Sequence, residues 1–350
     1  MTDRLPVAVV GVGHMGRHHV RKYSEMKDVK LVAVIDSNLE RARQIGEEFN
    51  VPYATELTPD LGDVAAVSIA VPTVYHLKVA APLIERGIAM LIEKPLAQNV
   101  QDARKIAALA EQHGTIVQVG HTERFNPAVR AVERMKVRPK FVESHRISPF
   151  TFRSADIGVT FDMMIHDIDI VLSLIQEPVA RVDAVGVNVL GPHEDIVNAR
   201  VTFAGGAVAT LTGSRLATKT ERKLRVFSES AYISLDYQKK MGIAVQREMN
   251  VDVIKFARER NIEDLSQISA ADYVKLVKVE PLIIQDKDAL ADELETFLSC
   301  VRTRQRPPVS AEDGVAAVAL AEQIVECVQS HQWDGPEGSR VGLTADIFGT

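Results

Sequence analysis

Short apolar segments alternate with helix-like segments through the first third of the chain. The apolar segments span residues 6–13, 30–36, 64–71, 88–95 and 115–121. Between them, segments such as 38–49 and 100–114 repeat apolar residues at the spacing of an amphipathic helix. Strands that lack polar alternation and are separated by helices are typical of a parallel sheet that is buried on both faces. The pattern therefore predicts a doubly wound α/β domain over residues 1–122.

A different pattern follows residue 122. After a predicted helix at 127–136, strand-like segments come in quick succession at 141–148, 179–190, 198–206, 207–214, 224–230 and 231–237. Several of them alternate apolar and polar residues, and "AGGA" at 204–207 has the composition of a hairpin turn. We therefore predict an α/β domain over residues 123–350 with a large, open, mainly antiparallel sheet. Helices are expected to return at 288–304 and 311–329.

Composition narrows the class of protein. The chain has 350 residues, of which 46% are hydrophobic and 25% charged, and its formal net charge is −6. Without a basic tail or stripe, we expect neither nucleic acid nor a membrane surface as a partner. The start "MTDRLPVAVVGVG" lacks the shape of a signal peptide, and the two cysteines, Cys300 and Cys327, have no paired spacing. These features favour a cytoplasmic protein.

The first apolar segment leads into a glycine-rich turn. Gly11, Gly13 and Gly16 have the G-x-G-x-x-G spacing, directly after a predicted strand and at the start of a predicted helix. Such a turn lets the backbone approach a pyrophosphate, which the helix N-terminus then faces. Asp36 lies 20 residues further on, at the end of the second strand. An acid there binds the adenosine ribose and repels a 2′-phosphate, so the sequence predicts a Rossmann domain that binds NAD rather than NADP.

Three histidines in the same segment could suggest a metal site. Adjacent residues of a helix point about 100° apart, and no acid completes a ligand set around His14, His18 and His19. We therefore expect these side chains to have packing and surface roles, and we expect no metal.

The segment 159–175 is apolar almost throughout, yet it carries a polar stripe. Asp162, His166, Asp169 and Ser173 recur at intervals of four, three and four residues, which on a helix places them on one face. Such a stripe must face water, a partner or a ligand, because unsatisfied buried polar groups are costly. Asp167 lies off the stripe and is expected to be structural.

The segment "LIEKPLAQNV", residues 91–100, ends an apolar strand with Glu93, Lys94 and Pro95. Ligands of open parallel sheets bind beyond the carboxyl ends of the strands. Pro95 ends the strand and restricts Lys94 to an extended backbone. The strand is therefore expected to deliver Lys94 to the ligand-binding edge of the sheet.

Together these motifs resemble the Gfo/Idh/MocA oxidoreductase family over nearly the whole chain. The resemblance rests on "GVGHMG", on "VPTVYH" at 71–76, on "EKP" at 93–95 and on the D-x-x-x-H of Asp162 and His166. "VPTVYH" departs slightly from the commoner Thr-Pro form. "VGHTERFNPAV" at 119–129 and "DIGVTFDMMIHDIDI" at 156–170 look like the nucleotide-sugar branch of this family. The resemblance implies oxidation of a sugar hydroxyl to a ketone with NAD, most specifically the 3-hydroxyl of a UDP-N-acetylhexosamine such as UDP-N-acetylglucosamine.

The resemblance also implies roles for individual residues. The catalytic residues would be Lys94, Asp162 and His166. Cofactor-binding residues would be Gly11, Gly13, His14, Met15, Gly16, Asp36, Pro72, Thr73, His76, Glu93 and Lys94. Further candidates for contacts with the sugar or its diphosphate are His121, Glu123, Arg124, Asn126, Arg146 and Arg153, where arginine suits phosphate because its planar fork binds two oxygens.

The chemistry leaves alternatives open. His166 is the favoured general base because imidazole titrates near neutral pH, but Lys94 would be the base if the cationic ring of oxidised NAD lowered its pKa. Asp162 would orient the histidine or bind a neighbouring hydroxyl. A second reading is an inositol or simple-sugar dehydrogenase that uses the same residues, and a third is a non-catalytic regulator that senses the dinucleotide. The resemblance further implies a homodimer or homotetramer built on the open sheet.

Overall fold

The computed structural model describes residues 4–56, 63–151, 156–247, 258, 277–333 and 341–343. Their contacts divide the chain into two compact units. The first unit combines the residues up to Phe125 with Lys287–Gln323, and the second combines Asn126–Asp286 with the residues from Ile324 onward. This division differs from the predicted one, which assigned everything after residue 122 to a second domain, because a C-terminal segment returns to the first unit.

Six parallel strands form the sheet of the first unit. They are β1 (Leu5–Val10), β2 (Val29–Ile35), β3 (Tyr53–Ala54), β4 (Ala66–Ile69), β5 (Ala89–Glu93) and β6 (Val117–Gly120). Their order is β3-β2-β1-β4-β5-β6, so the direction of strand addition reverses between β1 and β4. The predicted doubly wound sheet is confirmed, with the two-residue β3 as an addition.

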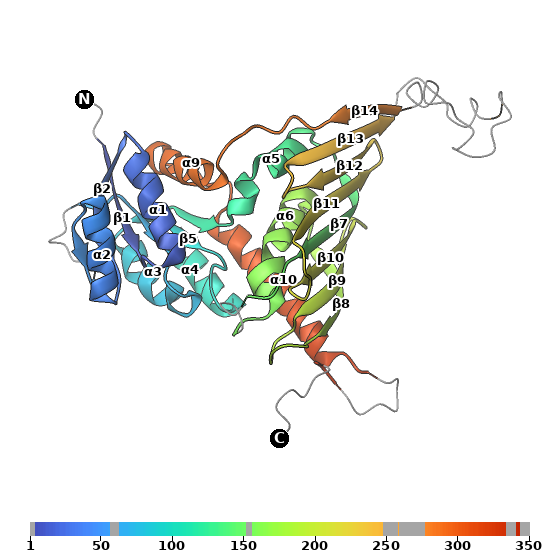
Figure 1. Cartoon of the computed structure of the whole chain (residues 1–350), viewed down its shortest axis with the longest axis horizontal. Helices are drawn as coiled ribbons and strands as arrows, with labels where there is room; N and C mark the ends of the chain where they lie inside the picture. Colours follow the sequence, from blue (N-terminus) through green and yellow to red (C-terminus); the bar gives the residue numbers. More distant parts are fainter. Residues whose placement is uncertain are drawn as a thin grey trace. The chain divides into compact units, whose positions relative to one another are not determined.

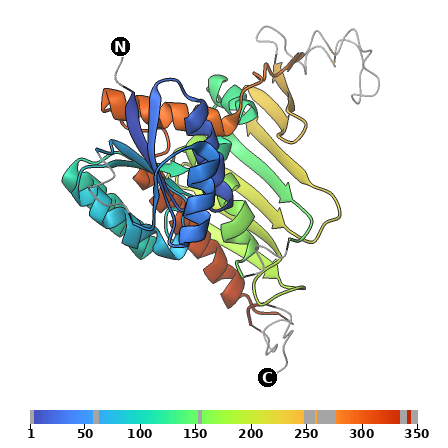
Figure 2. The same ribbon diagram turned by 60° about the vertical axis from the view of Figure 1, so that its left-hand side comes forward.

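Helices cover both faces of this sheet (Figure 2). Helices α1 (His14–Glu25) and α2 (Leu39–Phe49) pack together, and α3 (His76–Glu85) packs on α4 (Val100–His113). The boundaries follow local chemistry, since the Asn99 side chain caps the start of α4 and Gly114 ends it in a left-handed conformation.

The C-terminal segment joins the first unit through its core. Helix α9 (Ala289–Thr303) packs on α1 and contributes Leu294, Phe297 and Leu298, each at most 1% exposed, to the cluster that contains Val7 and Leu91. Burial of these three apolar side chains stabilises the packing of α9 on the first unit by several kcal/mol, at roughly 25 cal/mol per Å² of apolar surface. The helical pattern of this segment predicted the helix but not the sheet on which it packs.

The second unit is built on a mixed sheet of eight strands. They are β7 (Pro139–Ile147), β8 (Val179–Val187), β9 (Ile196–Phe203), β10 (Val208–Ser214), β11 (Glu221–Ser228), β12 (Ala231–Asp236), β13 (Met241–Arg247) and β14 (Val277–Pro281). The order is β14-β13-β12-β11-β7-β10-β9-β8, and every neighbouring pair is antiparallel except β7 and β10. The predicted open, mainly antiparallel sheet is confirmed, and so is the hairpin at 204–207, where Gly206 has φ 86°.

One face of this sheet carries helices. Helix α5 (Pro127–Arg134) contacts β12, and the π-helical turn η5 (Thr160–Met164) with α6 (Ile165–Ile175) contacts β7 and β10 (Figure 1). In the described part of this unit, no helix lies on the opposite face. The last helix, α10 (Ala311–Ser330), begins in the first unit and ends in the second. Among the described residues, no helix is long and apolar enough to cross a membrane.

Candidate active site

The glycine turn after β1 leaves space for a dinucleotide. Gly11 has φ +84°, and a Cβ there would lie 2.6 Å from the backbone nitrogen of Val71. A Cβ on Gly16 would collide with the carbonyl oxygen of Gly11, so this glycine allows α1 to pack close to the turn. A Cβ on Gly13 would meet nothing within 4 Å, so the backbone at the start of α1 is open to a ligand. The turn therefore fits the predicted pyrophosphate of a dinucleotide.

Asp36 lies at the end of β2 beside this turn and is 6% exposed. Its Oδ2 accepts the Val12 N–H over 3.0 Å, and its Oδ1 accepts the Asn38 N–H over 2.9 Å. Arg41 lies 3.3 Å from the same carboxylate. The acid is thus fixed against the glycine turn, where an adenosine ribose would reach it.

The other predicted cofactor contacts on this side differ in exposure. His14 and Met15 are exposed at the start of α1, as is Pro72 before the short helix η2 (Thr73–Tyr75), while Thr73 is half-buried. The His14 ring stands edge-on to His18 at 4.9 Å between centroids. In the described residues, no group of three or more His, Cys, Asp or Glu side chains is arranged to hold a metal ion.

Lys94 follows β5 directly and is half-buried, and the peptide bond between Lys94 and Pro95 is cis. Glu93 supports the turn, because its Oε2 accepts the Lys94 N–H over 3.3 Å and its Oε1 lies 2.9 Å from His19 Nε2. The parallel strands put this turn at the same sheet edge as the glycine turn and Asp36.

His76 ties two loops of that edge together. It is 1% exposed, and its Nδ1 lies 3.0 Å from the carbonyl oxygen of Pro95 and 3.2 Å from that of Leu96. Its Nε2 lies 3.0 Å from the carbonyl oxygen of Val71. Burial lowers the pKa of His76, although the carbonyl groups act in the opposite direction. The ring therefore joins the loops after β4 and β5 and holds the chain next to Lys94.

The loop after β6 carries three candidate substrate contacts. His121 is 1% exposed, and burial, together with nearby Lys94 and Arg124, lowers its pKa to about 3, so the imidazole stays neutral. Glu123 and Arg124 lie half-buried in the short helix η3 (Thr122–Phe125). Arg124 donates to the carbonyl oxygen of Pro308 over 3.2 Å.

Helix α9 is hydrogen-bonded to the same loop through Glu293. Glu293 is fully buried, and its Oε2 accepts the Thr122 hydroxyl over 2.8 Å, while Gln118 donates to its backbone carbonyl. Buried acids are costly unless hydrogen-bonded, so this carboxylate anchors the loop to the returning C-terminal segment. The sequence offered no signal for this contact, since the two segments lie about 170 residues apart.

Asp162 and His166 lie in the second unit on consecutive elements, the π-helical turn η5 and the start of α6. Both are half-buried, whereas Asp169 is only 2% exposed. The Ser173 hydroxyl returns to the carbonyl oxygen of Ile170 over 2.7 Å. The predicted placement of all four residues on one regular helix is therefore corrected: Asp162 lies in the π-helical turn, and only His166, Asp169 and Ser173 lie in the regular helix α6.

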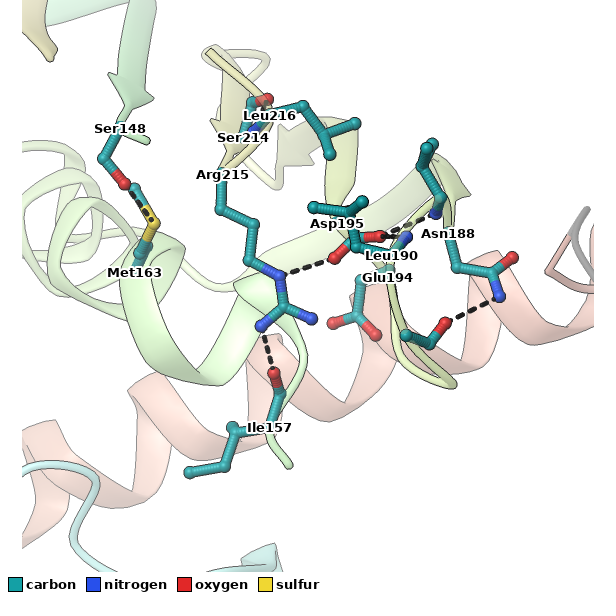
Figure 3. Close-up of polar contacts among 12 residues, drawn as sticks. Ser148, Ile157, Met163, Asn188, Leu190, Glu194, Asp195, Ser214, Arg215 and Leu216 are labelled. Carbon is teal, nitrogen blue, oxygen red and sulfur yellow. Dashed lines mark hydrogen bonds and ion pairs between the residues drawn. The ribbon is translucent and has the colours of Figure 1, made fainter. Parts of the chain in front are cut away.

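Two acids in the loop before β9 brace the chain ahead of η5. The Arg215 guanidinium donates to Asp195 Oδ1 over 2.6 Å and to the carbonyl oxygen of Ile157 over 2.6 Å (Figure 3). Glu194 accepts the backbone N–H of Thr160 over 3.2 Å. The Arg215 and Asp195 side chains are 3% and 0% exposed. These bonds hold both ends of the segment that leads into Asp162.

The charge on Asp195 is well stabilised. Burial raises the pKa of this carboxyl group, but the Leu190 and Val189 amides and the Arg215 guanidinium together lower it below its usual range. Both amides lie 2.6 Å from Asp195 Oδ2. The brace is therefore an ion pair with further hydrogen bonds, which is the arrangement that makes a buried charge tolerable.

The remaining predicted substrate contacts have structural partners or lie outside the described residues. Arg146 is 3% exposed and forks onto both oxygens of Asp167, over 3.1 and 2.8 Å. Asn126 caps α5, because its side-chain oxygen accepts the Ala128 N–H over 3.0 Å. Asp167 is structural, as expected. Arg153 lies outside the described residues.

Comparisons with known proteins place the chain among oxidoreductases. A family model described as "Oxidoreductase family, NAD-binding Rossmann fold" matches residues 5–121. A model of the GFO/IDH/MocA C-terminal domain matches residues 130–234. The two matches fall in the two units.

Individual relatives match over both units. The chain is 32% identical to UDP-N-acetylglucosamine 3-dehydrogenase of Acidithiobacillus ferrooxidans, with 92% of this chain and 96% of that protein covered. A solved structure of that enzyme superposes with a TM-score of 0.82 at 30% identity and covers 93% of this chain and 97% of its own. Inositol 2-dehydrogenase of Rhizobium meliloti is 23% identical, with 91% and 96% covered.

Proposed function

This chain belongs to the Gfo/Idh/MocA oxidoreductase family, and from that premise we propose that it oxidises the 3-hydroxyl of a UDP-N-acetylhexosamine such as UDP-N-acetylglucosamine to a ketone, with NAD. The observation that carries the proposal is the 32% identity to a UDP-N-acetylglucosamine 3-dehydrogenase over 92% of the chain. The similarity spans the unit with the glycine turn and the unit with Asp162 and His166. Inositol dehydrogenases align over the same length at lower identity.

A bound oxidised nicotinamide would accept the hydride that leaves the sugar carbon. The residues that would hold the dinucleotide are those of the glycine turn, with Gly11, Gly13 and Gly16 beside the pyrophosphate. Asp36 would accept hydrogen bonds from the adenosine ribose. Its carboxylate would repel a 2′-phosphate, which supports NAD over NADP.

We assign the proton transfer to His166 and Lys94. His166 would accept the proton of the sugar hydroxyl as general base, at Nδ1 or Nε2. Lys94 would stabilise the developing alkoxide through its ammonium group, or act as the base if the cationic nicotinamide lowered its pKa. Asp162, on the turn before His166, would orient the imidazole or bind a neighbouring hydroxyl.

The substrate contacts that we retain lie in the loop after β6. His121 would face the sugar as a neutral hydrogen-bonding group, because its pKa lies far below neutral pH. Glu123 would accept a sugar hydroxyl, and Arg124 would bind the diphosphate. Arg146 leaves the set, because its guanidinium is buried against Asp167.

The experiment that tests this function measures reduced nicotinamide with NAD and five substrates. These are UDP-N-acetylglucosamine, UDP-glucose, free N-acetylglucosamine, myo-inositol and glucose. We expect a signal with UDP-N-acetylglucosamine and none with the free sugars or the inositol. Lys94→Ala runs beside the wild type and is expected to give no signal. If the signal is absent, a 2-oxo acid is added as acceptor and the keto sugar is sought by mass spectrometry.

Other outcomes would favour the other functions. A signal with myo-inositol or glucose would make the chain an inositol or simple-sugar dehydrogenase. A third outcome is that the protein binds NAD but turns over no sugar and forms no keto sugar. That outcome would favour a regulator. Measurement of NAD binding in the same samples separates this outcome from inactive protein.

We also propose that the protein forms a homo-oligomer through the outer face of the eight-stranded sheet. Phe141, Phe227 and Tyr232 form an aromatic cluster on neighbouring strands there, with ring centroids 5.5 and 4.9 Å apart. Arg225 and Glu143 form an ion pair of 2.8 Å in the same region. A mixture of apolar and paired charged groups suits a second copy of the same surface. Light scattering would show a dimer or tetramer, and Phe227→Asp would weaken it.

A further inference from the structure

His19 and Glu93 form a buried pair beside the Lys94 turn. His19 lies on α1 and Glu93 is the last residue of β5, and their side chains are 0% and 10% exposed. His19 Nε2 lies 2.9 Å from Glu93 Oε1. Burial of two polar side chains is costly unless they are hydrogen-bonded, and here each is the partner of the other. No step proposed above uses the histidine.

The hydrogen bonds around the pair indicate where its protons lie. Within the part of the chain that the structure describes, no hydrogen-bond partner reaches His19 Nδ1. Buried N–H groups without an acceptor are rarer than underused acceptors, so His19 carries its one proton on Nε2 and donates it to Glu93. The second oxygen of Glu93 accepts the Lys94 N–H. Both oxygens of Glu93 thus accept hydrogen bonds, which is the pattern of a carboxylate, and we take the pair to carry one negative charge.

This charge lies in the half of the sheet that would receive the nicotinamide. The glycine turn and Asp36 belong to the half formed by β1 to β3, which takes the adenosine side of a dinucleotide. The other nucleotide then lies over β4 to β6, and Glu93 ends β5. Gly120 on β6 leaves room for the carboxyl group, since a Cβ there would lie 3.1 Å from Glu93 Cδ.

We propose that the His19–Glu93 pair makes the site select the oxidised cofactor over the reduced one. The oxidised nicotinamide ring is a cation and the reduced ring is neutral, and Lys94 adds a second positive charge on the same turn. The buried carboxylate offsets that charge and favours the cationic ring. Glu93 would act electrostatically, and His19 would be a positioning residue that holds the carboxylate in place through its hydrogen bond. The inference rests on the proposed use of NAD and does not depend on which sugar is oxidised.

The test measures the dissociation constants of NAD and NADH by calorimetry on the full chain without sugar. Glu93→Gln keeps the shape and an acceptor for His19, removes the charge and replaces the oxygen that accepts the Lys94 N–H by an NH2 group. We expect the ratio of Kd for NAD to Kd for NADH to rise roughly three- to thirtyfold, the range for one charge pair at a partly buried site. His19→Gln retains a donor near the position of Nε2 and is expected to keep the wild-type ratio. His19→Leu removes the hydrogen bond that holds the carboxylate in place, so the ratio should rise.

The control removes a carboxylate near the amino-terminal ends of the strands, at the end of the sheet opposite to Glu93. Glu85 is exposed at the end of α3, before β5 begins, and Glu85→Gln should leave the ratio unchanged. An unchanged ratio in Glu93→Gln would overturn the proposal, as would equal weakening of NAD and NADH, which indicates a purely structural bond. Absence of sugar oxidation in the wild type would contradict the proposed function but not this inference. Failure of the wild type to bind either cofactor would contradict both.

Discussion

The two units fix their candidate catalytic residues by different physical means. In the first unit, Lys94 follows a buried strand, and the turn around it is held by imidazole rings: His19 through Glu93, and His76 through the Pro95 carbonyl. In the second unit, a π-helical turn carries Asp162, and the chain ahead of it is held by the buried Asp195–Arg215 ion pair.

The two units differ in how much the segments next to their candidate catalytic residues depend on buried charges for their stability. The turn of the first unit lies at a sheet edge, where strand pairing already fixes the backbone and a few hydrogen bonds complete it. The described residues directly ahead of η5, 156–159, form no strand, and the buried pair of Arg215 and Asp195 holds them instead of strand pairing. Removal of one partner from a buried ion pair leaves an unpaired buried charge, and this costs more than loss of a hydrogen bond from a neutral imidazole. We therefore expect the second unit to be the more fragile of the two near its site.

The largest expected effect is on turnover. Lys94→Ala and His166→Asn should each lower kcat about 10²- to 10⁴-fold, the usual contribution of a proton-transfer group. In His166→Asn the affinity for NAD should change far less, because this variant alters neither the glycine turn nor Asp36. Steady-state kinetics with UDP-N-acetylglucosamine and calorimetry with NAD measure the two quantities. Equal losses of turnover and NAD affinity in His166→Asn would contradict its role as the base.

The next effect compares a buried ion pair with an exposed one. Arg215→Met leaves Asp195 buried without its partner and should lower the free energy of unfolding by about 3–5 kcal/mol. Arg17 and Glu48 in the first unit are also 2.6 Å apart, but their side chains are 59% and 36% exposed. Arg17→Met should therefore cost about 0–1 kcal/mol. Urea unfolding measures both variants.

Hydrogen exchange locates the effect of the buried pair. Amides of residues 157–166 should exchange faster in Arg215→Met, whereas those around Lys94 should not. The double variant with Asp195→Leu should regain part of the lost stability, since it removes the unpaired charge. Similar losses for Arg215→Met and Arg17→Met would show that the ion pair does not hold the second unit.

The comparison also explains what the sequence could predict. Lys94 at the sheet edge was predictable, because a strand that ends in proline and the rule for open parallel sheets act over a few residues. The supports of both sites were not, because His19 pairs with Glu93 over 74 residues and Glu293 with Thr122 over 171. The π-helical turn was also missed, since a helical repeat of polar residues does not distinguish it from an α-helix. His19 lies three residues after Gly16, but nothing in the sequence indicates that it is buried or that Glu93 is its partner.

The third effect depends on pH and tests the neutral imidazole of His121. An unfolded histidine gains a proton near pH 6.5, while the folded pKa of about 3 keeps His121 neutral. Between these values the unfolded state binds more protons, so stability falls as the pH falls. From pH 6.5 to 5 the loss should be about 1.6 kcal/mol, because the slope rises from about half of 1.4 kcal/mol per pH unit at pH 6.5 towards that full value at pH 5. His76, whose pKa is also lowered, acts in the same direction.

His121→Gln separates the loop histidine from the rest of the protein. Urea unfolding at pH 6.5 and 5 should give a smaller difference for this variant than for the wild type, because the substituted side chain does not titrate. An equal pH dependence would mean that His121 is protonated in the folded protein. Asp195 of the second unit should contribute little to this loss, since its pKa is already below the usual range for an aspartate.

The smallest effect compares two asparagine caps, one in each unit. Asn99 Oδ1 accepts the Asp102 N–H over 2.8 Å at the start of α4, and Asn126 does the same for Ala128 at α5. Replacement of either by Ala should lower stability by about 1 kcal/mol, the usual worth of a side-chain cap. Thermal unfolding measures both. If Asn126 also contacts the substrate, Asn126→Ala should raise KM for the nucleotide sugar while Asn99→Ala leaves it unchanged. The side-chain oxygen of Asn126 already accepts the Ala128 N–H. We therefore expect the KM for the nucleotide sugar to be the same in both variants.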